Sequence, residues 1–506
     1  MKVAIFTKIQ ALGTRVLAAI GLVSVIGTQS SFAESLAGSR PNILIIMPDD
    51  IGASGLKHLG AKTNYAEHIE SLFEKGIRLT DFHVSPTCAP SRAAMLTGRH
   101  ECYAGVTHTI NLRDRMNPEQ RLLTHVLKDA GYTTGIFGKW HLGDDDAYLP
   151  NARGFDEMYI HGAGGIGQNY AHSADFPNND YNNPVLLHND KVIRTEGYCT
   201  DLFFDQAIQW ITQQHAAGKP FFCFIPTNVT HGPHIPPLKD DGTYYPREEI
   251  LQNLDANVGK LLKELEAQSL MEDTLILYFA DNGGPSFGRL RGSKTSPYQG
   301  GSRVPCAMYW KGKLEGGREV SATTAHLDLY TTFAQLVGKV DEPVPGGEAW
   351  DGRNMLPLLE SADAKWSDRD LVTHKTRWDG SADENQYKNA SIRHGDFQLV
   401  WNPKGEVELY DLKKDLQQKQ NIAAQHPEIV STLKTTYDGW WKDVRPYMIN
   451  DELENVPAEH KPYHERYRKA FGEAAYKEAM EKMTWTGGKP FGDKKKKKSK
   501  ARSAHD

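Results

Sequence analysis

The segment NILIIMPDD, residues 42–50, joins a short apolar run to a pair of carboxylates. A continuous apolar run of this length is typical of a strand whose two faces are both buried in a parallel sheet. Further runs of the same kind occur along the chain: YTTGIFG (132–138), PFFCFIP (220–226), TLILYFA (274–280) and VPCAMYW (304–310). These runs predict the strands of one large sheet.

Segments with the apolar spacing of amphipathic helices lie between the predicted strands. They are IESLFEKGIR (69–78), LLTHVLKDAG (122–131), the run 201–218 and the run 250–270. Strands that alternate with helices in this way favour an α/β fold, in which helices sandwich a large, mostly parallel sheet.

The pattern changes from residue 371 onward. Apolar and polar residues alternate through 390–412, as they do in antiparallel strands, and a helical pattern follows at 427–441. We therefore expect a large α/β domain at 40–370 and a smaller C-terminal α+β subdomain at 371–490.

The chain begins with the pattern of a secretion signal. Basic residues precede the apolar run VLAAIGLVSVIG (16–27), and the small residues of SFA, which ends at Ala33, suit a cleavage site. The run is too short to cross a bilayer comfortably, so we expect residues 1–33 to be a signal peptide and the protein to be periplasmic or secreted. The basic tail at 491–506 is expected to be disordered.

The composition argues against several classes of partner. The chain of 506 residues has a net charge of -5, which makes nucleic acid an unfavourable main partner. No second segment approaches the length of a membrane span, so no membrane partner is expected. The 5 cysteines, at positions 88, 102, 199, 223 and 306, are sparse and odd in number, which does not suit a disulfide framework. One of them is therefore available for a chemical role.

Polar residues follow four of the predicted strands at their carboxyl ends, which is where open parallel sheets bind ligands. They are Asp49 and Asp50, Lys139 and His141, His231 and His234, and Asp281 and Asn282. Each cluster alone has an ordinary structural explanation, as a turn, a helix cap or a histidine that forms its hydrogen bonds within the fold. Together they supply carboxylate and amide oxygens, which suit Ca²⁺ or Mg²⁺ rather than zinc.

Basic residues accompany this predicted metal site, namely Arg92, Lys139 and Lys294. A divalent cation combined with lysines, an arginine and histidines favours binding of a tetrahedral oxyanion, either sulfate or phosphate. The nucleophile of such a site should lie beside the metal and the arginine, at a helix N-terminus. Cys88 has that position in the sequence.

CAPSRAAMLTGRH (88–100) resembles the signature of the type I formylglycine-dependent sulfatases of the arylsulfatase family, Cys-x-Pro-Ser-Arg followed by Leu-Thr-Gly-Arg. PDDIG, GKWHLG, FFCFIPTNVTHGPH, DNGG and LRGSKTSPYQGGSRVP are similar to the family's other blocks and occur in the family's order. The resemblance extends from residue 41 to about residue 310. It implies the alkaline-phosphatase-like fold, with a large α/β domain and a smaller C-terminal α+β domain.

The resemblance also implies a mechanism. A maturation enzyme would oxidise Cys88 to Cα-formylglycine (3-oxoalanine), and its recognition would need Pro90 and Arg92. One hydroxyl of the hydrated aldehyde would attack the sulfur to form a covalent sulfo-enzyme intermediate, and the second would later expel sulfate. One Ca²⁺ would complete the site. The residues that match its ligands are Asp49, Asp50, the modified Cys88, Asp281 and Asn282.

The remaining polar residues match further positions of the family. Arg92 matches the residue that steadies the diol, and Lys139 and Lys294 match the lysines on the sulfate oxygens. His141 matches the residue that accepts the diol proton during elimination. His231 matches the residue near the leaving oxygen, which is a candidate general acid with or through Lys294.

The sequence departs from the family's pattern at two positions. Gln299 stands where the family often has Glu, and Pro48 stands where it often has Ala. Neither residue has a proposed chemical role, although Gln299 is expected to alter the charge near Lys294.

We expect the substrate to be a sulfated carbohydrate, such as a polysaccharide fragment. Residues 158–198 are predicted as an irregular insert, and its stretch from Tyr159 to His188 carries polar and aromatic side chains that can bind sugars. His234 would add a polar group that touches the substrate. The alternatives are a general arylsulfatase, a phosphodiesterase or phosphonate hydrolase of the same superfamily, and a non-catalytic binder of sulfated glycans.

Overall fold

The computed structural model of the chain describes residues 35–51, 56–62, 65–110, 112–168, 174–284, 290–339, 352–453 and 456–483, which belong to one compact unit. The predicted signal peptide and the predicted basic tail lie outside the described residues. Within these ranges, no helix combines the length and the apolar character that a bilayer crossing requires.

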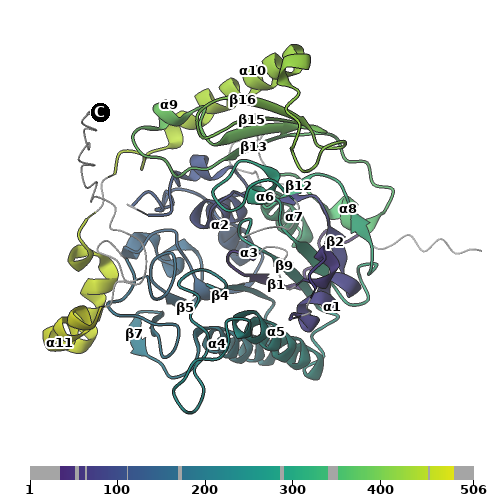
Figure 1. Cartoon of the computed structure of the whole chain (residues 1–506). Coiled ribbons are helices and arrows are strands. Elements are labelled where there is room, and N and C mark those ends of the chain that lie inside the picture. Colours follow the sequence, from purple (N-terminus) through teal and green to yellow (C-terminus); the bar gives the residue numbers. More distant parts are fainter. Residues whose placement is uncertain are drawn as a thin grey trace, which may run out of the picture. The chain divides into compact units, whose positions relative to one another are not determined.

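A ten-stranded mixed sheet forms the centre of the molecule (Figure 1). In spatial order its strands are β11 (Glu319–Val320), β2 (Ile77–Leu79), β10 (Cys306–Tyr309), β9 (Thr274–Phe279), β1 (Asn42–Met47), β8 (Phe221–Pro226), β4 (Thr133–Lys139), β5 (Glu157–His161), β6 (Val185–His188) and β7 (Lys191–Arg194). Strands β9, β1, β8, β4 and β5 pair in parallel, and every residue of β1, β8 and β9 is buried. Both faces of these strands are covered, which explains why their sequences are continuously apolar.

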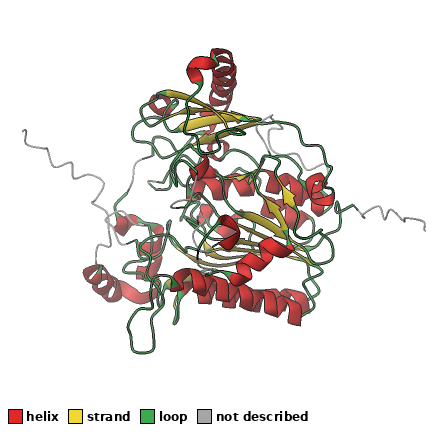
Figure 2. Ribbon diagram, turned by 45° about the vertical axis from the view of Figure 1, so that its right-hand side comes forward, coloured by secondary structure: helices red, strands yellow, loops and turns green. Residues whose placement is uncertain are grey.

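Helices cover both faces of the sheet. Helices α1 (Glu67–Lys75), α4 (Cys199–Ala216) and α5 (Glu249–Ala267) pack together on one face. Helices α2 (Cys88–Thr97), α3 (Leu123–Asp129) and α7 (Asp328–Leu336) pack together on the other. Figure 2 shows the long helices beneath the strands of the central sheet. This arrangement confirms the predicted α/β sandwich.

The first predicted helix ends earlier than its apolar pattern indicates. Helix α1 ends at Lys75, and Ile77 already belongs to strand β2. A Cβ atom on Gly76 would lie 2.5 Å from the carbonyl oxygen of Leu72 and 2.6 Å from that of Met308 in β10. The glycine thus allows the chain to leave the helix and to pair with β10 within one residue.

A second sheet lies in the C-terminal part of the chain and is antiparallel. It consists of β13 (Asp370–His374), β14 (Ala390–His394), β15 (Phe397–Trp401) and β16 (Val407–Asp411), and helix α10 (Pro427–Val444) packs against it. Leu399, Trp401, Tyr437 and Trp440 are buried between the sheet and the helix. This confirms the predicted α+β subdomain.

The last described helix, α11 (Pro462–Lys482), packs beside β7 of the large sheet. Its residues Tyr463, Tyr467 and Tyr476 are part of the large core. The shorter elements are β3 (Phe82–His83), β12 (Thr324–Ala325), α6 (Gln299–Ser302), α8 (Leu356–Glu360) and α9 (Ala382–Asn385).

The region predicted as an irregular insert contains regular structure at both of its ends. Strand β5 begins it, and β6 and β7 form an antiparallel hairpin that extends the large sheet. The hairpin turn lies at Asn189 and Asp190, and Asn189 has a φ angle of 50°. Asparagine tolerates this left-handed conformation, which suits a two-residue hairpin turn. Only the middle of the region is a loop in the described residues, and residues 169–173 lie outside them.

Candidate active site

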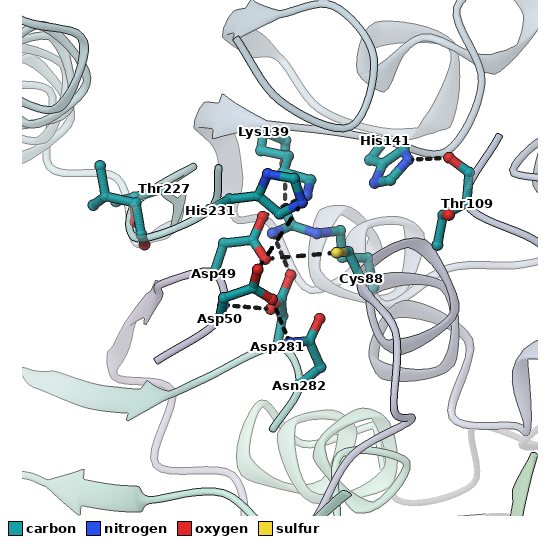
Figure 3. Close-up of polar contacts among 12 residues, drawn as sticks. Asp49, Asp50, Cys88, Thr109, Lys139, His141, Thr227, His231, Asp281 and Asn282 are labelled. Carbon is teal, nitrogen blue, oxygen red and sulfur yellow. Dashed lines mark hydrogen bonds and ion pairs between the residues drawn. The ribbon is translucent and has the colours of Figure 1, made fainter. Parts of the chain in front are cut away.

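The carboxyl ends of the central strands bring the predicted polar residues together (Figure 3). Asp49 and Asp50 follow β1, Asp281 and Asn282 follow β9, and Lys139 is the last residue of β4. The strands are neighbours in the order β9-β1-β8-β4, so these side chains meet although they are far apart in sequence. His231, which follows β8, lies beside them.

The carboxylates are tied to lysines and to an amide. Lys139 Nζ donates to Asp49 Oδ2 at 2.5 Å, and both side chains are fully buried. Lys294 Nζ donates to Asp50 Oδ1 at 2.6 Å and lies 3.7 Å from Asp49 Oδ1. Asn282 Nδ2 also donates to Asp50 Oδ1, at 2.6 Å. Despite burial, the charge of Lys139 holds the pKa of Asp49 well below its usual value.

Cys88 is the first residue of helix α2, and all the residues of this helix are buried. Lys294 Nζ donates to Cys88 Sγ at 3.0 Å, and Sγ lies 3.5 Å from Asp49 Oδ1. Burial and the charge of Asp49 oppose ionisation, but the charges of Lys139 and Lys294 lower the pKa of the Cys88 thiol to about 7. A reactive group at position 88 therefore lies at a helix N-terminus among positive charges, which stabilise an anion there.

Arg92 is fully buried one turn further along α2. Its Nη2 donates to Asp281 Oδ2 at 2.8 Å, and its Nη1 donates to the carbonyl oxygen of Lys139 at 2.5 Å. Burial and the charge of Asp49 raise the pKa of Asp281, and the guanidinium of Arg92 opposes this shift. Arg92 thus holds together α2 and the ends of β9 and β4.

Replacement of Arg92 by leucine is expected to lower the free energy of unfolding by about 3–5 kcal/mol, because Asp281 would lose its buried countercharge. Urea unfolding monitored by circular dichroism would measure this. Arg121→Leu is the matched control, since its ion pair with Asp129 is exposed and is expected to contribute about 0–1 kcal/mol. Equal losses of stability in the two variants would show that the buried ion pair contributes no more than the exposed one.

The cluster has the ligands of a hard divalent cation. One ligand atom from each of Asp49, Asp50, Cys88 and Asp281 lies within 4.8 Å of the others. Asn282 Oδ1 is buried and has no hydrogen-bond partner among the described residues, so one oxygen beside the carboxylates is available as a ligand. Three carboxylates and an amide oxygen fit Ca²⁺ or Mg²⁺. Asp50 is held at a φ of 59°, which is uncommon for a residue with a side chain and typical of a functional constraint.

The two predicted catalytic histidines differ in environment. His141 Nε2 lies 2.7 Å from the carbonyl oxygen of Thr109, which fixes the proton on Nε2, whereas Nδ1 is buried without a described partner. Burial, and then the charge of Lys139, lowers the pKa of His141 to about 3. His231 Nε2 lies 4.0 Å from Asp50 Oδ2; although burial opposes the shift, the charge of Asp49 raises the pKa of His231.

His234 is close enough to His231 and Asp50 to interact with them electrostatically, but it lies outside the hydrogen-bond network of the cluster. It is half-buried, has a φ of 61°, and forms no side-chain hydrogen bond with the site residues within the described ranges. The amide of Gln299 contacts the small subdomain, since its Nε2 donates to Gln398 Oε1 at 2.9 Å.

Two site neighbours could not be identified from the sequence. Gln168 Nε2 lies 3.2 Å from His231 Nδ1, and the hydroxyl of Tyr181 donates to the carbonyl oxygen of His231 at 2.8 Å. Both belong to the predicted insert, whose polar composition indicated a ligand-binding role for the segment but singled out neither residue. They place the insert directly against the histidine.

Comparison with known proteins gives one family. Residues 41–339 match the family described as Sulfatase. Arylsulfatase G of Mus musculus is 30% identical over 63% of this chain and 69% of its own length. N-acetylgalactosamine-6-sulfatase of Canis lupus familiaris is 29% identical over 64% of this chain and 66% of its own length.

A solved structure shows the same architecture over most of the chain. The crystal structure of Ps i-CgsB in complex with k-i-k-neocarrahexaose superposes with a TM-score of 0.68 and 24% sequence identity. The match covers 87% of this chain and 99% of that chain.

Proposed function

Because the chain belongs to the sulfatase family, whose members hydrolyse sulfuric esters, we propose that it acts on sulfated carbohydrates with a formylglycine derived from Cys88 and one Ca²⁺. The position of Cys88 carries this proposal. Its Sγ occupies the place that a hydroxyl oxygen of hydrated formylglycine would take, 3.0 Å from Lys294 Nζ and beside the carboxylates. The predicted signal peptide would bring the enzyme to the periplasm or the exterior, where such polymers occur.

The cation would be held by Asp49, Asp50, Asp281 and Asn282 together with residue 88. When bound, Ca²⁺ supplies positive charge that polarises the nucleophile and the sulfate oxygens. Lys294 retains 21% side-chain exposure and can donate to a sulfate oxygen, whereas the fully buried Lys139 balances the charge of Asp49. His231, which like Lys294 lies within 4.0 Å of Asp50, can protonate the leaving oxygen.

His141 can accept a proton throughout the physiological range. A base acts only when it is deprotonated, and a pKa of about 3 keeps this imidazole neutral well below pH 7. We propose that its free Nδ1 receives the proton that is released when residue 88 expels sulfate.

Replacement of His141 by asparagine is expected to lower kcat by about 10²–10⁴-fold, because the proton acceptor is lost. The factor is expected to be the same at about pH 5.5 as at about pH 7.5, whereas an ordinary histidine with a pKa of about 6.5 would contribute much less at the lower pH. Steady-state assays of the wild type and the variant across this pH range would measure the ratio of their kcat values. A factor that shrinks as the pH falls would contradict a neutral, buried base.

Two observations support a carbohydrate substrate: the polar side chain beside His231, and a relative that is named for a sulfated sugar. Gln168 from the insert lies beside His231 and is partly exposed, and polar side chains of this kind bind sugar hydroxyls. Tyr181 is fully buried and holds the insert against the backbone of His231. The N-acetylgalactosamine-6-sulfatase that resembles this chain is named for a sulfated sugar.

The test is sulfate release from defined sulfated saccharides, compared with hydrolysis of p-nitrophenyl sulfate and p-nitrophenyl phosphate, with and without a chelator. The protein should be co-expressed with a formylglycine-generating enzyme. Higher kcat/KM for a saccharide than for either aryl ester is expected. A strong preference for the aryl sulfate would leave a general arylsulfatase, and a preference for the phosphate would contradict the sulfatase assignment.

A further inference from the structure

Two basic residues of the small subdomain lack an acidic partner. Lys375 and Arg377 follow strand β13 and are half-buried. Within the described part of the chain, neither head group forms an ion pair or a hydrogen bond, although each reaches solvent. Other partly buried arginines of the subdomain are paired, as Arg445 is with Asp383. Partly burying an unpaired cation is unfavourable unless an anion binds to it.

A chain of contacts connects the segment that carries this pair to the loop beside His141. Trp378 Nε1 donates to Asp451 Oδ1 at 2.8 Å, and the same oxygen lies 4.0 Å from Arg113 Nη1. The carbonyl oxygen of Arg113 accepts a hydrogen bond from the backbone of His108, whose neighbour Thr109 lies 2.7 Å from His141 Nε2. The segment that carries Lys375 and Arg377 is thus linked through one carboxylate to the loop that holds the catalytic histidine.

The backbone between the two basic residues is constrained. Thr376 is fully buried and has a φ of 43°, which is a rare conformation for a β-branched residue. Its backbone nitrogen donates to His374 Nδ1 at 3.1 Å, while its Oγ1 is buried without a partner in the described chain. Conformations of this kind persist where the surrounding structure enforces them, and they are concentrated at ligand-binding sites.

The local charge is predominantly positive, although Asp451 lies 4.0 Å from Arg113 and the charge of Asp379 acts on Lys375. After burial, the charges of Arg377, Arg113 and Lys375 lower the pKa of His108 to about 3. Burial and the charge of Arg377 likewise lower the pKa of Lys375. These basic side chains therefore share one region next to the loop of His108 and Thr109.

We propose that Lys375 and Arg377 form a second anion subsite, which binds a sulfate or carboxylate group of the saccharide while a different sulfate ester occupies the active site. The guanidinium of Arg377 can bind two oxygens of either group, and Lys375 adds a point charge. The preferred substrate is then a saccharide with at least two anionic groups. This inference rests on the proposed sulfatase function and narrows its substrate.

The experiment compares three disaccharides as competitive inhibitors of p-nitrophenyl sulfate hydrolysis: one with a single sulfate, one with two sulfates, and one with a sulfate and a uronate. The double variant Lys375→Gln/Arg377→Gln is compared with Lys413→Gln/Lys419→Gln, which removes the same charge from exposed positions of the same subdomain. The wild type is expected to bind a doubly charged ligand about 10–100-fold more tightly than the singly charged one. The subsite variant is expected to lose this preference, and the control is expected to keep it. Arg377→Lys, which retains the charge, is expected to keep part of the preference for doubly charged ligands.

The same ligands are titrated calorimetrically into the Cys88→Ala protein, which requires no turnover. A preference for doubly charged ligands in this protein supports the subsite even if no hydrolysis is detected. The subsite and the sulfatase function are therefore tested independently. Equal affinities for singly and doubly charged ligands in the wild type, or a preference that survives in the subsite variant, would overturn the inference. The two doubly charged ligands show whether the second group is a sulfate or a carboxylate.

Discussion

Replacement of Cys88 by alanine is expected to lower kcat for sulfate-ester hydrolysis by about 10⁴-fold or more, because the variant has no group that can attack the sulfur. The fold should persist, since a buried side chain becomes smaller at only one position. Cys306→Ala is the control: burial raises the pKa of this β10 thiol well above its usual value, and the residue lies in the core away from the cluster. That variant is expected to remain active.

Mass spectrometry of the wild-type peptide that contains residue 88 is expected to show loss of sulfur and two hydrogens and gain of one oxygen, which is the change from cysteine to formylglycine. Activity should increase with the fraction of modified peptide among preparations. Full activity in protein that contains only unmodified cysteine would end the formylglycine proposal, although the family assignment would remain.

Replacement of Asp50 by asparagine is expected to reduce Ca²⁺ affinity and to lower kcat/KM by about 10²–10³-fold, because a charged ligand becomes neutral. Asparagine has nearly the same shape and tolerates the φ of 59° at this position, so the backbone should not change. Calorimetric titration of Ca²⁺ into chelator-treated protein measures the affinity directly.

A second measurement of the metal site does not depend on activity. Ca²⁺ is expected to raise the melting temperature of the wild type, since a ligand that binds only the folded state stabilises it, and to do so much less in Asp50→Asn. Asp205→Asn, which alters an exposed residue paired with Lys260, should respond as the wild type does. Stoichiometric zinc in the purified protein, or equal responses in all three proteins, would contradict the proposed calcium site.

The sequence predicted the centre of the molecule well because its signals there are local. An apolar run such as residues 42–47 is followed directly by the polar residues of its carboxyl end, and parallel pairing then brings Asp49 and Asp281 together. The same reasoning missed strand β2, because the apolar helical pattern continues past Gly76, where the helix has already ended. It also missed the β6–β7 hairpin, because Asn189 adopts the left-handed conformation at a turn that lacks glycine.

Residues that reach the site through tertiary packing had no local signal. Lys375 and Arg377 come from the small subdomain, far in sequence from Thr109 and His141, and only the contact of Asp451 with Trp378 and Arg113 shows their place. Gln168 lies within a loop that carries many polar residues, so nothing in the sequence separates it from the others. Such positions depend on long-range packing, which periodicity does not encode.

The complete burial of helix α2 has a consequence for how the enzyme is made. Every residue from Cys88 to Thr97 is buried, and Arg92 is clamped between Asp281 and the backbone of Lys139. Under the proposed mechanism, a maturation enzyme that binds Pro90 and Arg92 could not reach them in the folded protein. The oxidation would then take place on the nascent, still extended polypeptide, before the chain collapses. The catalytic capacity of each molecule would be decided during its biosynthesis, and a molecule that folded too early would keep its thiol.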